Sequence, residues 1–465
     1  MLLMRHWFSV ALLSAMAGTS ARGDEPSPRL MTSRPEMKAQ IEALKNREAR
    51  IPLPSLTPEE IAAGKRSANN GRLRSLYLPE SWLASRGPSS SSGGRTRSGA
   101  VPAPAAAAPP GGGLSMSDRS SGPEYVFRKK LFWIVSRTND CQYCLGHQEL
   151  ALRRTMSDDE IASLDADWSI FPASEQAAIA FARKVTLTPH LVDEADIRSL
   201  QAHFSDERIV DIVQTLAGNN STNRWTDSTG IPQDRSSNPD EPRQLDTPTS
   251  EAASRFRTKV APIDYVPRPA WEPQSEALEA MAACRGRTAA VKLPRIEVAQ
   301  QILAADTPGI VPPAWVQVAS YFPQSALRLW KHRQALARDG RLDPKLKALI
   351  PWVCAREDRA WYAAAHARAR LGALGMTDDV LFAIGGKEEG FTAAERTTFA
   401  FARKLTSAPH TIVDSDVAAL KSHFSDHEVA EVIFLICDAN SFDRFTEALR
   451  LPLEGGIRLS TAATE

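Results

Sequence analysis

The sequence predicts an all-α protein built from two tandem copies of one helical domain. The main observation is an ordered internal repeat, in which FARKVTLTPH at 181–190 recurs as FARKLTSAPH at 401–410. LQAHFSDERIVDIV at 200–213 recurs with the same offset as LKSHFSDHEVAEVI at 420–433. Further upstream the offset is shorter by one residue, so that Trp133 matches Trp352. Ordered matches at a nearly constant offset indicate a duplicated domain.

The repeated segments carry signals of helices rather than strands. Apolar residues recur at helical spacing in both copies, as in Ile209, Ile212, Val213 and Leu216 and in Val429, Val432, Ile433 and Ile436. Capping-box pairs mark expected helix starts, at Thr57 with Glu60, Ser157 with Glu160, Thr392 with Glu395 and Ser425 with Glu428. Since runs of alternating apolar and polar residues are absent, we interpret each copy as a bundle of packed helices.

The copies are placed at residues 24–232 and 263–465. Residues 86–122 form a low-complexity insertion of Ser, Gly, Pro and Ala in the first copy, where the second copy has a helical pattern at 327–340. The linker 233–262 is polar as far as Ser254. Neither the insertion nor this polar stretch has enough apolar residues to form a core, so both are expected to lack regular structure.

The N-terminus predicts a signal peptide at residues 1–23. Arg5 and His6 precede a short apolar stretch, which is followed by small residues suited to cleavage. That stretch is too short to span a bilayer. We therefore expect export to the periplasm or the extracellular space, with a cytosolic chain as the alternative. Charges are balanced, at 56 Lys plus Arg against 55 Asp plus Glu, so nucleic acid is not an expected partner.

The candidate chemistry lies in a C-x-x-C motif at Cys141 and Cys144. Residues three apart share a helix face, so the two sulfurs can meet, and His147 extends the same face. A helix cap at Asn139 or Asp140 would place Cys141 in the first turn and favour its thiolate. Zinc binding would need more ligands than this region offers, and haem attachment needs a histidine directly after the second cysteine. No cofactor or metal is predicted, and a purely structural disulfide is the alternative to a redox dithiol.

These residues resemble the alkylhydroperoxidase D and carboxymuconolactone decarboxylase superfamily. The resemblance rests on CQYCLGH, on FARKVTLTPH and on the segment that ends in NRWTDSTGIP, and it covers residues 125–232 and 313–452. It implies an all-helical fold, symmetric oligomers and peroxide reduction. By position it makes Cys144 the cysteine that is oxidised to a sulfenic acid and Cys141 its proton donor and resolving partner.

The sequence departs from this family at two positions. Gln148 stands where the peroxidase members have a histidine, and Lys129 stands where they have a glutamate in a proton relay. We therefore expect slow peroxide turnover, with dithiol–disulfide exchange as a possible better activity. Lys129 or Lys130 could stabilise a thiolate if either points inward.

The second copy has lost the dithiol. Ala360 and Ala363 occupy the cysteine positions, and His366 is retained in place of His147. We expect this copy to be structural and His366 to be a packing or surface residue. Other residues with expected structural roles are the tryptophans Trp133 and Trp352, the helix-end histidines His190, His203, His410 and His423, and the cysteines Cys354 and Cys437, which form a bridge only if they lie close together.

The leading hypothesis is an exported thiol oxidoreductase, leaning towards an enzyme, that acts on a small hydroperoxide or on a protein dithiol or disulfide. The electron donor is not specified by the sequence, and a homo-oligomer without a membrane span is expected. The alternative is a non-catalytic helical module for assembly or ligand binding, while a lactone decarboxylase is disfavoured because that branch lacks the cysteines. The exposure of the cysteines distinguishes the oxidoreductase from the non-catalytic module. A reactive cysteine is expected at a pocket, whereas a structural one is expected to be shielded from solvent.

Overall fold

The computed structural model describes residues 31–62, 69–84, 122–234, 249–260 and 270–459. Within these ranges every regular element is a helix, and one isolated β-bridge joins Ser33 to Arg257. The prediction of an all-α fold is therefore confirmed. The expected signal peptide at 1–23 lies outside the described residues, as does nearly all of the low-complexity insertion.

The helices form one set in the N-terminal half and a second set in the C-terminal half. The first set comprises α1 (Arg34–Ala43), η1 (Leu44–Asn46), α2 (Pro58–Ala62), α3 (Asn69–Tyr77), α4 (Glu80–Ala84), α5 (Pro123–Thr138), α6 (Gln142–Leu152), α7 (Asp158–Ala166), η2 (Trp168–Ile170), α8 (Ala173–Leu187), η3 (Pro189–Leu191), α9 (Glu194–Gln201), α10 (Asp206–Ser228) and α11 (Glu251–Arg255). The second set comprises α12 (Gln274–Ala283), η5 (Cys284–Gly286), α13 (Ile296–Leu303), α14 (Ala314–Ala319), α15 (Pro323–Arg338), α16 (Pro344–Asp358), α17 (Trp361–Ala373), α18 (Asp378–Ala383), α19 (Ala393–Ser407), η6 (Pro409–Thr411), α20 (Asp414–Lys421) and α21 (Asp426–Ala448).

The order of helices from α5 to α10 recurs from α16 to α21. The last helix of each series is 23 residues long, and α10 and α21 begin at positions that the sequence repeat matches to each other. The correspondence reaches further back than the repeat that we identified, because α1 with η1 and α12 with η5 have the same lengths. Matched backbone bonds support it: Arg50 N donates to Thr229 O and Ala290 N donates to Leu449 O, both at 2.8 Å.

The local signals in the sequence account for where the helices begin and what they bury. The four expected capping-box pairs are present as hydrogen bonds, at Thr57, Ser157, Thr392 and Ser425. The apolar stripes of α10 and α21 are buried, and they form part of one continuous core. Gly230 follows the C-cap of α10, its φ of +65° gives a left-handed turn, and a side chain there would meet Arg50 at 2.8 Å.

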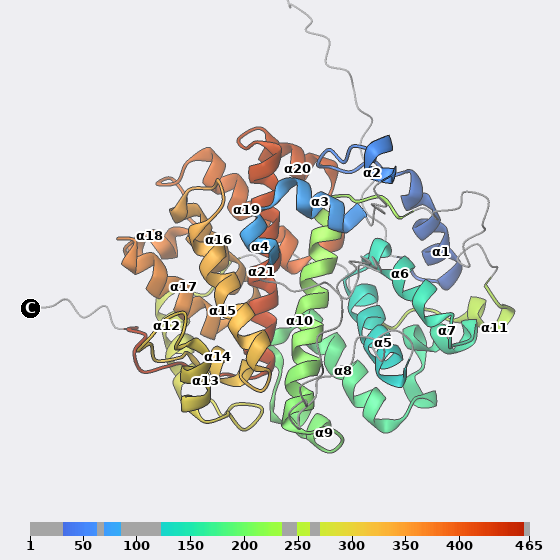
Figure 1. Ribbon diagram of the computed structural model, residues 1–465, viewed down its shortest axis with the longest axis horizontal. Coiled ribbons are helices and arrows are strands. Elements are labelled where there is room, and N and C mark those ends of the chain that lie inside the picture. The colour runs from blue at the N-terminus through green and yellow to red at the C-terminus, as the bar shows by residue number, and fades with distance from the viewer. Residues whose placement is uncertain (1–30, 63–68, 85–121, 235–248, 261–269, 460–465) are drawn as a thin grey trace, which may run out of the picture.

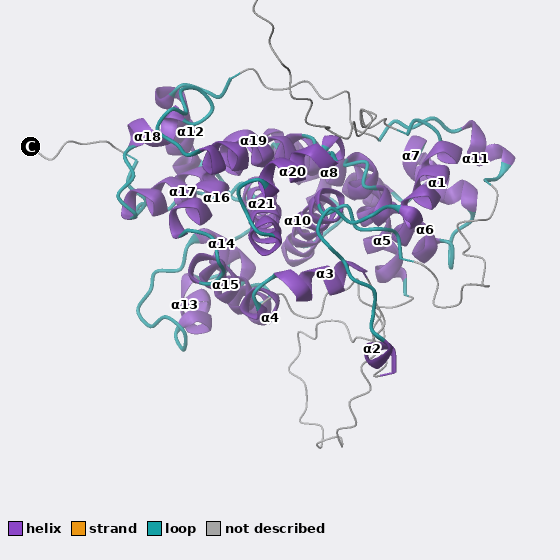
Figure 2. Cartoon of the chain, turned by 90° about the horizontal axis from the view of Figure 1, so that it is seen from above, coloured by secondary structure: helices purple, strands orange, loops and turns teal. Residues whose placement is uncertain are grey.

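Helices α10 and α21 lie side by side at the centre of the molecule, with α5 and α8 next to α10 and with α16 and α19 next to α21 (Figures 1 and 2). Helices α3 and α4 cross from the N-terminal half onto α21 and α15. Trp82 is fully buried there, stacks on Phe434 with ring centroids 5.6 Å apart, and donates from Nε1 to Ala335 O. The N-terminal segment therefore contributes to the core of the other half.

The expectations for the connecting segments need one correction. The helical pattern at 327–340 is confirmed, because these residues lie largely in α15. Part of the polar stretch is folded, however: residues 251–255 form α11, and the backbone of Ser250 donates to Asp158. Ser250 caps this helix through its side chain, a local signal that outweighs the scarcity of apolar residues.

Candidate active site

The dithiol lies where α5 ends and α6 begins. Asp140 adopts a left-handed conformation with φ of +55°, and Cys141 N donates to Ser136 O at 2.8 Å. This bond, which spans six residues of the chain, is the Schellman ending of a helix. The same Cys141 is the N-cap of α6, which places Cys144 in the first helical turn. The expectation that Asn139 or Asp140 caps the helix and puts Cys141 in the first turn is therefore wrong by one position.

Both sulfurs are buried and close to one hydroxyl group. Cys141 is 0% exposed and Cys144 is 2% exposed, and both are free cysteines. Their Sγ atoms lie 3.2 Å and 3.3 Å from Oγ1 of Thr226, on α10. Thr226 belongs to the segment NRWT at 223–226, which recurs in the second copy as DRFT at 443–446. The sequence alone did not assign it to the site.

The hydrogen bonds of Thr226 indicate how it serves the two thiols. Its hydroxyl also lies 3.1 Å from the carbonyl oxygens of Thr222 and Asn223. A hydroxyl has one hydrogen to donate and two lone pairs. When that hydrogen points to a carbonyl, the oxygen is left to accept from the S–H groups of Cys141 and Cys144, and rotation of the hydroxyl redirects the hydrogen to a thiolate.

Burial raises the pKa of two groups at the dithiol, Cys141 and Asp227. Burial, followed by the hydrogen bond and negative charge of Cys144, raises the pKa of Cys141 well above its ordinary value. Burial thus opposes the thiolate that the helix start was expected to favour at Cys141. Burial, followed by the negative charge of Cys141, also raises the pKa of the neighbouring Asp227 well above its ordinary value, although the positive charge of Arg47 opposes this. Asp227 is thus a carboxyl group beside the dithiol whose protonated form is favoured by burial, and it was not identified from the sequence.

Of the two lysines considered, Lys129 is the one near the dithiol. Burial and repulsion by Arg154 lower the pKa of Lys129, while the charge of Cys144 acts to raise it. Lys130 instead pairs with Glu175 at 2.7 Å. The cation expected to stabilise a thiolate is therefore Lys129, which interacts with Cys144.

The hydrogen bonds of His147 go to a carboxylate and a backbone carbonyl group. Its Nε2 lies 2.9 Å from Oδ2 of Asp234, and its Nδ1 lies 2.9 Å from the carbonyl oxygen of Tyr143. Both neighbours are acceptors, so the doubly protonated ring satisfies them together. Among the hydrogen bonds of the described residues, none joins His147 to Cys141 or Cys144. The structure therefore brings the two cysteines together but does not bring this predicted site residue to them.

The second copy repeats the histidine arrangement without the thiols. His366 Nε2 lies 2.9 Å from Glu454, to which the hydroxyl of Tyr362 donates at 2.5 Å. Tyr143 donates in the same way to Asp234. An acidic residue at matched positions of the two copies, together with a repeated Tyr-x-x-x-His, was the sequence signal for this pair. Since the copy without sulfurs retains it, the histidine–carboxylate pair does not depend on the dithiol.

The remaining predicted structural residues are placed as follows. Trp133 and Trp352 are 0% exposed, as expected for core residues. Cys354 and Cys437 are buried and form no disulfide. The four helix-end histidines lie in or just after short helical segments, at His190, His203, His410 and His423.

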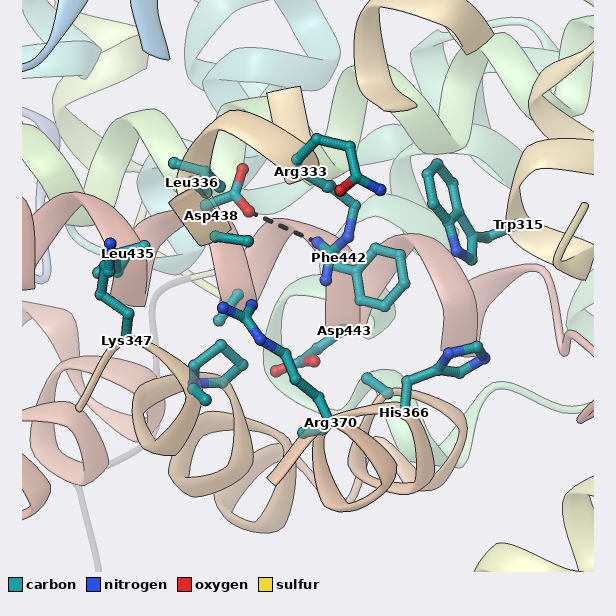
Figure 3. A pocket seen from close by; sticks show the side chains of 17 residues that line it. Trp315, Arg333, Leu336, Lys347, His366, Arg370, Leu435, Asp438, Phe442 and Asp443 are labelled. Atoms are coloured by element: carbon teal, nitrogen blue, oxygen red, sulfur yellow. Dashed lines mark ion pairs between the residues drawn. The ribbon is translucent and has the colours of Figure 1, made fainter. Parts of the chain in front are cut away.

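A cavity lies in the second copy at the position of the dithiol (Figure 3). Its volume is about 310 Å³. Ala363, which replaces Cys144, lines it together with His366. Ala348, which stands where Lys129 does in the first copy, lies in the same wall.

Comparison with models of known protein families gives no match, and comparison with curated proteins finds no similar sequence. No helix in the described part of the chain is long and apolar enough to cross a membrane. In the same residues, no cluster of three or more His, Cys, Asp or Glu side chains is arranged to hold a metal ion.

Proposed function

We propose that this chain is an exported thiol oxidoreductase of the alkylhydroperoxidase D-like type, in which Cys141 and Cys144 reduce a small hydroperoxide. The observation that carries this proposal is the contact of two free thiols with one hydroxyl, Thr226, next to Asp227, whose buried carboxyl oxygen Oδ2 has no hydrogen bond among the described residues. A purely structural disulfide would need neither a proton reservoir nor a hydroxyl that can both accept from a thiol and donate to a thiolate.

The proposed chemistry divides the work between the two sulfurs. Cys144, in the first turn of α6 and near Lys129, attacks the peroxide as a thiolate. The O–O bond breaks, Cys144 becomes a sulfenic acid, and the alcohol leaves with a proton supplied from Asp227 through Cys141. The Cys141 sulfur then attacks Cys144, which releases water and forms a disulfide. Two electrons from an external thiol reductant restore both thiols.

Burial of the sulfurs favours a small substrate. A protein disulfide cannot approach sulfurs that are 0% and 2% exposed, whereas a hydroperoxide needs a much smaller opening. Dithiol–disulfide exchange with a protein partner is therefore the less favoured version of the activity.

We further infer that the two copies pack as a built-in pseudo-dimer. The support is the shared helix order and a pair of reciprocal bonds, in which Arg224 donates to Thr406 O and Arg444 donates to Thr186 O. When two matched residues each make the same contact with the opposite copy, the interface typically has two-fold symmetry.

The second candidate function is a non-catalytic helical module, and the burial of both sulfurs is the observation that favours it. One experiment separates the two candidates. The protein is incubated with tert-butyl hydroperoxide and excess dithiothreitol, and peroxide loss is followed for the wild type, Cys144→Ser and Ala363→Ser. Peroxide loss that Cys144→Ser abolishes and Ala363→Ser retains supports the enzyme. A wild type no faster than Cys144→Ser leaves the non-catalytic module as the function.

A further inference from the structure

The cavity of the second copy is formed by small side chains on three helices. Ala348 on α16, Ala363 on α17 and Ala439 on α21 face it. The first copy has Lys129, Cys144 and Asn219 at these positions. Helix α15 closes the remaining side with Leu336 and Arg333. The copy that lacks the dithiol therefore has a pocket in its place.

The cations that line this pocket differ in their partners. Arg333 lies 3.6 Å from Asp438 and its guanidinium is stacked 3.7 Å from the ring centroid of Phe442. Lys347 Nζ is held by the carbonyl oxygen of Asp339 at 3.0 Å. Arg370, by contrast, pairs with no acid in the part of the chain that the structure describes, and burial and repulsion by Arg333 lower its pKa. A half-buried guanidinium without a counterion is costly in free energy, and an anion would offset that cost.

A second group in the pocket is also without a partner. Asp443 is 1% exposed, and its Oδ2 has no hydrogen bond among the described residues. Burial, followed by the negative charge of Asp358, raises the pKa of Asp443 well above its ordinary value. In its protonated form it is a hydrogen-bond donor rather than a second negative charge. Figure 3 shows Arg333 and Arg370 reaching into the pocket from opposite walls, with Asp443 between them.

We propose that this pocket binds a small organic monocarboxylate, with its carboxylate at Arg370 and Asp443 and its apolar body against the alanine-lined wall. One unpaired guanidinium matches one negative charge, and a guanidinium beside a carboxylic acid offers several donors to two carboxylate oxygens. Leu336, Pro351 and Ala367 provide the apolar surface for the body of the ligand. The second copy is on this proposal a ligand-binding unit, not only a structural partner of the first.

Two probes and their uncharged counterparts test the proposal on the full-length protein. Benzoate and hexanoate are compared with benzamide and hexanamide by calorimetry and by the shift in Tm. A carboxylate should bind and raise the Tm, and its amide should not. Arg370→Gln should weaken carboxylate binding about tenfold or more. The same substitution should leave the Tm of the unliganded protein equal or higher, because it removes an unpaired buried charge, whereas a purely structural arginine would lower it.

The controls isolate the pocket from the rest of the molecule. Arg328→Gln, on the exposed face of α15, should leave carboxylate binding unchanged. Cys144→Ser should also leave it unchanged, so this result is independent of the peroxidase assay. Failure of both carboxylates to bind, equal binding of the amides, or full binding by Arg370→Gln would each overturn the proposal.

Discussion

Arg224 and Arg444 make the same contact in opposite directions. Nη2 of Arg224 donates to Thr406 O at 2.7 Å, and Nη2 of Arg444 donates to Thr186 O at 3.1 Å. Their charges are compensated differently, because Arg444 pairs with Asp358 at 2.7 Å while Asn139 stands at the matched position beside Arg224. Burial and repulsion by Arg444 lower the pKa of Arg224 to about 9. One carboxylate thus serves two buried guanidinium groups.

This arrangement predicts that Asp358→Asn is strongly destabilising. It leaves both arginines without a carboxylate in a buried site, and breaking one member of a buried ion pair costs about 3–5 kcal/mol. The free energy of unfolding in urea measures the change. Glu194→Gln, at an exposed and loosely paired acid, should change it by less than about 1 kcal/mol. Equal effects of the two substitutions would contradict this account of the interface.

Much of the fold could be predicted because its signals are local. The spacing of Ile209 and Val213, and the pairing of Ser425 with Glu428, depend on residues within one or two helical turns. The equivalence of α1 and α12 was missed because their sequences have diverged and they lie further apart in the chain than the segments of the repeat do. It becomes visible only in the matched backbone bonds.

Only the part of the candidate site that depends on neighbouring residues could be predicted from the sequence. Cys141 and Cys144 stand in one motif, so their proximity follows from helix geometry. Thr226 and Asp227 come from α10, a helix distant in the sequence, and only tertiary packing brings them to the sulfurs. The burial that raises the pKa of Cys141 is also tertiary, so an argument from the helix start alone could not include it.

Thr226→Val should slow the reaction of the dithiol with hydroperoxide. Valine keeps the shape of threonine but removes the hydroxyl that contacts both sulfurs, so a Cys144 thiolate would lose a hydrogen bond worth about 1–3 kcal/mol. We expect roughly a tenfold slower reaction, measured as the rate of peroxide loss. Thr446→Val is the matched control, since Thr446 makes the same bonds to its own helix but contacts no cysteine. Equal rates for the two variants would remove Thr226 from the mechanism.

Asp227→Asn should impair proton delivery rather than folding. The amide fills the same space but cannot carry a proton, and loss of a positioned acid typically slows a reaction by about a hundredfold. The pH–rate profile should also lose the limb that Asp227 contributes, which a purely structural role would not change. Glu447→Gln is the matched substitution in the second copy, where Glu447 pairs with Arg287 at 2.9 Å. It should lower stability and leave the rate unchanged, and a rate loss of similar size in both variants would argue against the assignment.

The last prediction concerns acid stability and the carboxylate of the second copy. Burial alone would raise the pKa of Glu454, but His366, the Tyr362 hydroxyl and the backbone N–H of Ala314 together lower it from 4.5 to about 2. A carboxyl whose pKa is lower in the folded than in the unfolded state contributes stability above its unfolded pKa, here 4.5. That contribution is lost as the pH falls from 4.5 towards 2. The shift corresponds to about 3 kcal/mol at most, and because Glu454 is 24% exposed the effect should be smaller.

Glu454→Gln should therefore destabilise the protein at neutral pH by about 1–2 kcal/mol, with a shrinking effect as the pH falls below that unfolded pKa. Urea unfolding at pH 7, 5, 4 and 3 measures both values. Glu389→Gln, at an exposed glutamate of the same copy, should follow the wild type at every pH. The effect of Glu454→Gln shrinks in acid because the wild type loses the charge of Glu454 there, and with it the ion pair to His366. The variant has no charge at this position to lose. Coincident curves for Glu454→Gln and the wild type would mean that the His366–Glu454 pair adds nothing to stability, and a constant offset between them would mean that its contribution does not depend on the charge of Glu454.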